Sequence, residues 1–179
     1  VLYKLPDYIH DGGLDFYLVN PLSTKFLVSF SDINLMLIPY MFSGIILSIY
    51  SLSLLNITPN IVEITLLVFI VACYLTVIYS LYLFLMSFYF WLLESNIEHL
   101  YLSLGYIVRF PLDILNNLGK FTYLNIIPLG LAAYITVRII LHKSSWQEIF
   151  LVFPITLIIY VISDRFWHFA LKSYTSASS

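Results

Sequence analysis

The fold is decided by residues 33–93, which read INLMLIPYMFSGIILSIYSLSLLNITPNIVEITLLVFIVACYLTVIYSLYLFLMSFYFWLL. This stretch has a single charged side chain, Glu63. About 20 mostly apolar residues cross a bilayer as a helix, so the stretch is too long for one crossing. Residues 56–60, Asn-Ile-Thr-Pro-Asn, are a turn signal whose proline cannot continue a helix. The stretch therefore predicts two membrane spans, over 33–55 and 61–93.

The composition of the whole chain agrees with a membrane protein. Hydrophobic residues make up 61% of the 179 residues and charged residues only 10%, where a soluble chain has about 25% charged residues. The mean hydropathy is +0.94. Aromatic residues reach 18%, as is typical of side chains that lie at lipid headgroups. The net charge of −2 gives no basic surface for nucleic acid, so the lipid bilayer is the expected environment and nucleic acid is excluded as a partner.

Two further spans are expected over 121–141 and 149–169. Residues 94–117, which precede these two spans, contain charged side chains, and their apolar residues recur at helical spacing, which favours an amphipathic helix in the membrane interface. The predicted fold class is an all-α, polytopic membrane bundle of four transmembrane helices with surface-lying amphipathic helices. One alternative stays open, in which 85–108 crosses the membrane and 110–141 forms a re-entrant hairpin.

Residues 1–32 are polar enough to lie outside the bilayer. Pro6, Gly12-Gly13 and Pro21 divide them, so we expect two short surface helices near 7–11 and 14–19. The expected organisation is a cytoplasmic coupling segment over 1–32, a transmembrane helical domain over 33–171 and a cytoplasmic tail over 172–179. With four spans, both ends of the chain share one side of the membrane with residues 94–120. Lysine and arginine favour that side by six residues to two, which predicts that both ends are cytoplasmic. The six are Lys4, Lys25, Arg109, Lys120, Arg165 and Lys172, and the two are Arg138 and Lys143.

Few side chains qualify as chemical sites. Glu63 is an intramembrane acid, but it follows Asn60 by three residues, which favours a capping role in the first turn of its helix. Glu94, Glu98 and His99 lack a fourth ligand for a metal and fit a solvated helix face better. Gly119-Lys120 does not complete a phosphate-binding loop, because Phe121 follows it. We therefore expect no catalysis by this chain and no bound cofactor.

A stripe of small side chains is the other feature of the first span. Gly44, Ser48 and Ser51 recur at helical spacing along 33–55. Small residues let membrane helices approach each other closely. The stripe predicts a helix-packing face whose partner is another span or a second protomer.

Several short motifs resemble one known family. The most specific is residues 11–22, Asp-Gly-Gly-Leu-Asp-Phe-Tyr-Leu-Val-Asn-Pro-Leu, followed by Phe90-Trp91, Arg109-Phe110-Pro111-Leu112, Ile127-Pro128 and the tail Tyr174-Thr175-Ser176-Ala177. In this order they resemble ABC-2 type permeases, the membrane subunits of bacterial ATP-driven transporters. The chain departs from the family pattern at Asn20, where a basic residue is usual.

The resemblance implies a permease subunit in the bacterial plasma membrane. It implies two partners, an ABC ATPase subunit and a second permease protomer, identical or related. It also implies six spans, so this chain is expected to be the C-terminal two-thirds of a permease. The segment predicted to dock the ATPase consists of Asp11, Gly12, Gly13, Leu14, Asp15, Phe16, Tyr17 and Leu18. An ion-coupled carrier or channel and a non-transporting scaffold are the alternatives; a carrier would need intramembrane charges, and this chain has almost none.

Overall fold

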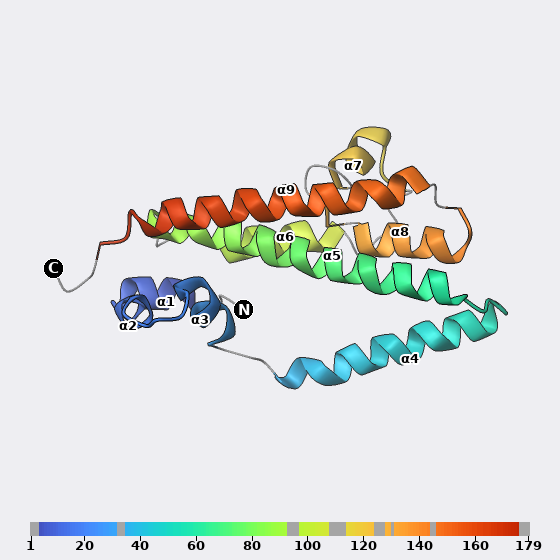
Figure 1. Ribbon diagram of the computed structural model, residues 1–179, viewed down its shortest axis with the longest axis horizontal. Coiled ribbons are helices and arrows are strands. Elements are labelled where there is room, and N and C mark those ends of the chain that lie inside the picture. The colour runs from blue at the N-terminus through green and yellow to red at the C-terminus, as the bar shows by residue number, and fades with distance from the viewer. Residues whose placement is uncertain are drawn as a thin grey trace.

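The computed structural model describes residues 4–31, 35–92, 97–107, 114–123, 128–129, 131–143 and 146–175. All the regular secondary structure in these ranges is helical, as the composition predicts. Figure 1 shows a long bundle with a cluster of short helices beneath one end. The helices are α1 (Leu5–His10), α2 (Leu14–Leu18), α3 (Thr24–Phe30), α4 (Ile38–Leu54), α5 (Ile61–Met86), α6 (Ile97–Ile107), α7 (Asn117–Phe121), α8 (Leu131–Ile140) and α9 (Trp146–Leu171), with short 3-10 turns η1 (Leu35–Leu37) and η2 (Ser87–Phe90).

Three of the expected spans are present as continuous helices. Among the described residues, the helices long and apolar enough to cross a membrane are Leu35–Leu54, Ile61–Phe90 and Ile149–Leu171. They match the predicted spans at 33–55, 61–93 and 149–169 to within a few residues. The middle one is longer than a bilayer needs, and its last turn tightens into η2.

The remaining predicted span, 121–141, is wrong as a continuous helix. Pro128 lies outside any helix, and α8 begins only at Leu131. The 10 residues of α8 rise about 15 Å, half the hydrocarbon thickness. The alternative crossing over 85–108 is not formed either, because α5 and η2 continue to Phe90 and α6 begins at Ile97.

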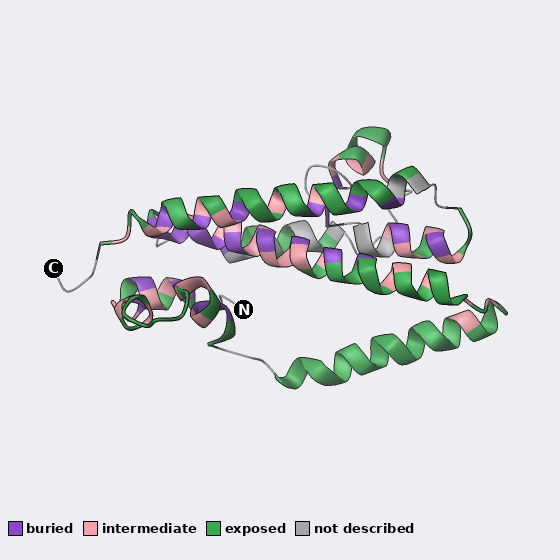
Figure 2. Cartoon of the chain, viewed as in Figure 1, coloured by how far each residue is buried: buried purple, intermediate pink, exposed green. Residues whose placement is uncertain are grey.

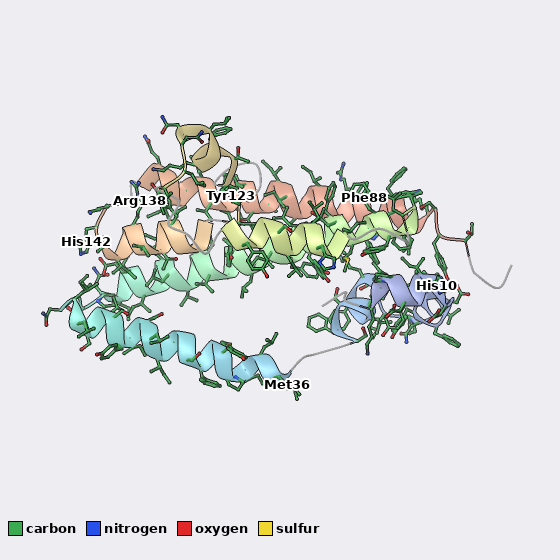
Figure 3. The ribbon with its side chains drawn as sticks, turned by 180° about the vertical axis from the view of Figure 1, so that it is seen from behind. His10, Met36, Phe88, Tyr123, Arg138 and His142 are labelled. Carbon is green, nitrogen blue, oxygen red and sulfur yellow. The ribbon has the colours of Figure 1, made fainter. Side chains whose placement is uncertain are left out.

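Two shorter helices, α6 and α8, lie where that span was expected. The helix α6, expected in the membrane interface, instead runs along α5, and α8 follows it end to end along the bundle axis (Figures 1 and 3). The two have 11 and 10 residues and together rise roughly 30 Å, the thickness of one crossing. Two separate half-length helices, with α7 between them in the chain, therefore lie along α5 where one continuous span was predicted.

The core of the bundle lies between α5 and α9, which pack along much of their length. Buried serines and threonines line this contact, and three of their hydroxyls donate to a carbonyl one turn back on their own helix. These are Ser80 to Thr76, Ser87 to Leu83 and Thr156 to Val152, at 2.6–2.8 Å. Satisfied in this way, the small side chains let the two backbones approach closely. In Figure 2 the buried residues form a stripe where α5 and α9 face each other.

The helix α4 stands apart from this core. None of its residues is buried, and Figure 2 colours almost its whole length as exposed. It joins α5 through a turn in which Asn56 has a positive φ of 52°, a conformation that asparagine tolerates better than most residues.

Candidate functional site: a helical cluster at one end of the bundle

The helices α1, α2 and α3 form a compact cluster beneath one end of the bundle (Figure 1). The helices expected at 7–11 and 14–19 are confirmed as α1 and α2. Between them Gly12 has a φ of 73°, which glycine adopts without strain, as the Gly-Gly turn predicts. The third helix was not predicted. Its N-cap is Ser23, whose side chain accepts a hydrogen bond from the Phe26 amide at 3.4 Å.

The inner face of the cluster is apolar and buried. Its four fully or nearly fully buried side chains are Leu5, Ile9, Leu14 and Val28. They join one hydrophobic core with the far ends of α5 and α9, contributed by Leu83, Met86, Tyr89, Phe90, Trp167 and Ala170. The rings of Phe90 and Trp167 meet edge to face at 5.6 Å. The cluster is therefore anchored to the α5–α9 pair.

Two polar contacts reinforce this anchor, and both start from α3. The Lys25 ammonium forms an ion pair with the Asp164 carboxylate on α9. One turn further along α3, the Ser29 and Tyr79 hydroxyls hydrogen bond at 3.0 Å, which ties α3 to α5. Burial of Lys25 opposes its charge, but the hydrogen bond and charge of Asp164 outweigh this and raise the pKa of Lys25.

Sequence reasoning missed Asp164 as a candidate. The signal was present, because Asp164 is an acid within the predicted span 149–169. What the sequence does not show is its partner, which lies 139 residues away along the chain.

The outer face of the cluster carries exposed apolar side chains. Phe16 is 80% exposed and Val19 84% exposed, and Leu18 is also exposed. The predicted docking segment is thus divided, since Leu14 belongs to the core while Phe16 and Leu18 face outward. Tyr17 is half-buried, and its ring lies 5.0 Å from that of Tyr8.

The acidic residues and glycines of the same segment have local structural surroundings within the cluster. Asp11 accepts from the His10 imidazole at 2.8 Å, and this hydrogen bond and the carboxylate charge raise the pKa of His10. Asp15 lies in the first turn of α2, where a negative charge suits the helix dipole. Gly13 precedes α2 beside Tyr8, whose ring atom would lie 3.4 Å from an added Cβ. The contact of Asp11 with His10, the turn at Gly12-Gly13 and the first-turn position of Asp15 are thus all local features of the cluster.

The predicted packing stripe lies on α4. A Cβ added at Gly44 would meet no atom within 4 Å. Ser48 and Ser51 are exposed, and their hydroxyls donate to the carbonyls of Gly44 and Leu47 at 2.8 Å. Within the described chain the stripe therefore faces no packed helix, and its role in packing stays a prediction.

The opposite end of the bundle holds Glu63, where Figure 3 also places Arg138 and His142. Asn60 and Glu63 form a reciprocal capping box at the start of α5, with both hydrogen bonds at 2.9 Å. This confirms the capping role predicted for Glu63. The His142 imidazole lies 3.2 Å from the Glu63 carboxylate and joins the α8–α9 turn to α5. Asn60, Glu63 and His142 border an open pocket of about 260 Å³.

A metal site finds no support in the described ranges. His99 is exposed, Glu94 lies outside the described residues, and nothing is described of the Glu98 side chain. Within those ranges no three histidine, cysteine or acidic side chains gather as a metal would need.

Long apolar helices around a packed pair, with a surface cluster at one end, define a polytopic membrane protein. The chain matches the family described as ABC-2 family transporter protein over residues 1–178. Because the match covers nearly the whole chain, the protein belongs to this family, and it is a membrane component of an ABC transporter. No curated protein and no solved structure matched the chain.

Proposed function

We propose that this chain is a permease subunit that forms the translocation path, while a separate ABC ATPase subunit hydrolyses ATP. The ATPase docks on the outer face of the α1–α2 pair. The observation that carries this proposal is the exposure of Phe16 and Val19 on a cluster whose inner face is fully buried. Exposed aromatic and apolar side chains held on a rigid base are typical of protein-binding surfaces.

The proposed orientation places the cluster and both ends of the chain in the cytoplasm of a bacterium. It is supported by Lys4, Lys25, Arg165 and Lys172, which belong to the cluster or the last part of α9 and its tail. Lys120 gives no such support, because α7 lies beside the middle of the bundle in Figure 1. In this arrangement residues 1–32 dock the ATPase, 33–171 form the membrane domain and 172–179 form a cytoplasmic tail. A second permease protomer, identical or related, packs against α4.

The docking proposal is tested by replacing Phe16 with alanine and measuring how much ATPase co-purifies with the chain. Truncating an aromatic anchor at an interface typically costs about 2 kcal/mol or more, so we expect most of the ATPase to be lost. Tyr17 is left in place because its ring packs against Tyr8 within the cluster.

The matched control is Phe150→Ala, which removes an equally exposed ring from α9 at the other end of the bundle. This variant should retain its ATPase. Equal recovery of ATPase with the Phe16→Ala chain, in a protein that inserts normally, would rule out this face as the docking site.

A further inference from the structure

The helix α3 touches the bundle through two polar side chains on one face. Lys25 and Ser29 are four residues apart, so they project from the same side of the helix. Lys25 pairs with Asp164 on α9, and its ammonium also lies 5.5 Å from the centre of the Tyr160 ring, one turn earlier on α9. Ser29 meets Tyr79 on α5. The helix α3 therefore bridges the two helices that form the core of the bundle.

The ion pair is partly withdrawn from solvent. The side chains of Lys25 and Asp164 are 19% and 29% exposed. Asp164 lies seven residues before the end of α9, about 10 Å inside it. The second carboxylate oxygen of Asp164 faces His168, whose ring nitrogen is 3.6 Å away. Removing one partner of a partly desolvated pair leaves the other charge uncompensated, so either single change weakens the contact between α3 and α9.

The helix α4 has no comparable link to the cluster. The hydrophobic core that contains Leu5, Ile9, Leu14 and Val28 includes no residue of α4. No α4 residue is buried at all. Among the described residues, a displacement of the cluster therefore acts on α5 and α9 through a shared core and an ion pair, and α4 contributes no residue to that core.

We propose that the Lys25–Asp164 ion pair is the contact that transmits movement of the α1–α3 cluster to α9. The cluster thus drives the α5–α9 pair rather than α4, the span that directly follows it in the chain. This inference rests on the proposed function, in which the ATPase docks on the outer face of the cluster. Lys25 and Asp164 are positioning residues, because they couple two parts of the membrane subunit and touch no nucleotide.

The test uses the complex of the full chain with its ATPase in lipid nanodiscs. Cys73, the one cysteine of the chain, is replaced by serine, and Gln147→Cys places an exposed reporter in the first turn of α9, far from Lys25. The rate of maleimide labelling is measured with and without ATP plus vanadate, which traps an ATPase after one turnover. With the ion pair intact we expect ATP plus vanadate to change the labelling rate.

The informative variants are Lys25→Met, Asp164→Asn and the charge-swapped pair Lys25→Asp with Asp164→Lys. Contacting residues couple strongly, so each single change should reduce the ATP-dependent difference in labelling rate by about fivefold. The charge-swapped pair should restore most of that difference. Lys172→Met, which removes an exposed charge just beyond α9, is the control and should respond normally. Restoration by the swap distinguishes a specific contact from general loss of stability.

The amount of co-purified ATPase separates this inference from the docking proposal. We expect all these variants to retain it. If Lys25→Met releases the ATPase, the ion pair maintains the docking surface and does not transmit movement, so the inference is overturned. It is equally overturned if the reporter does not respond with the ion pair intact, if the single variants respond normally, or if the swap restores nothing. If the ATPase fails to co-purify even with the unaltered chain, the docking proposal itself fails.

Discussion

The helices α4 and α9 are nearly equal in hydropathy and are both long enough to cross a bilayer, yet they are packed differently. None of α4 is buried, while α9 buries a stripe of residues of very different sizes. These are Ile149, Val152, Thr156, Ser163, Trp167 and Ala170. In lipid an apolar side chain gains little by exchanging a lipid neighbour for a protein neighbour. Hydropathy thus places a helix in the membrane, and the fit of large and small side chains decides what it packs against.

The largest effect on stability is expected when a packed ring is removed from α9. Trp167 is fully buried against Phe90 and the cluster, so we expect Trp167→Ala to lower the free energy of unfolding by about 3 kcal/mol. Tyr50→Ala, which removes an exposed ring from α4, should change it by less than about 0.5 kcal/mol. Thermal unfolding of both variants in detergent measures the difference. Equal losses would mean that α4 is packed within the isolated chain.

A second test adds volume instead of removing it. Ala170 on α9 is fully buried, so Ala170→Leu should destabilise the chain by about 1–3 kcal/mol through overpacking. Gly44→Leu on α4 meets no atom and should leave stability within about 0.5 kcal/mol. If the small-residue stripe packs against a second protomer, Gly44→Leu should nevertheless weaken assembly in detergent, measured by cross-linking. Unchanged assembly would remove the stripe as an interface.

The smallest effect concerns how the two neighbouring spans begin. The helix α5 starts with a capping box, whereas no side chain caps α4 at Leu37. Asn60→Ala removes the acceptor for the Glu63 amide and should cost about 1 kcal/mol in thermal unfolding. Asn60→Ser keeps an acceptor and should stay close to the parent chain. If Asn60→Ala left the thermal stability unchanged, His142 and the surrounding lipid would be sufficient to fix this end of α5 without the cap.

The sequence predicted those parts of the fold that depend on local pattern. Long apolar runs predicted α4, α5 and α9, and the positions of helix-breaking glycine and proline residues predicted α1 and α2. It failed at 121–141, because the apolar run was assigned to one span although Pro128 lies outside any helix and α8 begins only after it. Counting apolar residues cannot distinguish one complete crossing from two halves contributed by separate helices.

The candidate site was predicted only in outline. Leu14 and Phe16 are both apolar residues of one short helix, yet one belongs to the core and the other faces outward. A five-residue helix has too few turns for its apolar residues to define a buried face. The contact between Lys25 and Asp164 depends on two segments far apart in the chain, which no local pattern reports.

The two half-length helices α6 and α8 have ends at positions where one continuous helix would have none. The last carbonyls of α6 and the first amides of α8 have no partners within their own helices, and both helices pack on α5. Backbone of this kind is stable in a membrane only when protein or enclosed water satisfies it. The ends of α6 and α8 are consequently the most polar backbone of this part of the chain, whatever the hydropathy of its sequence.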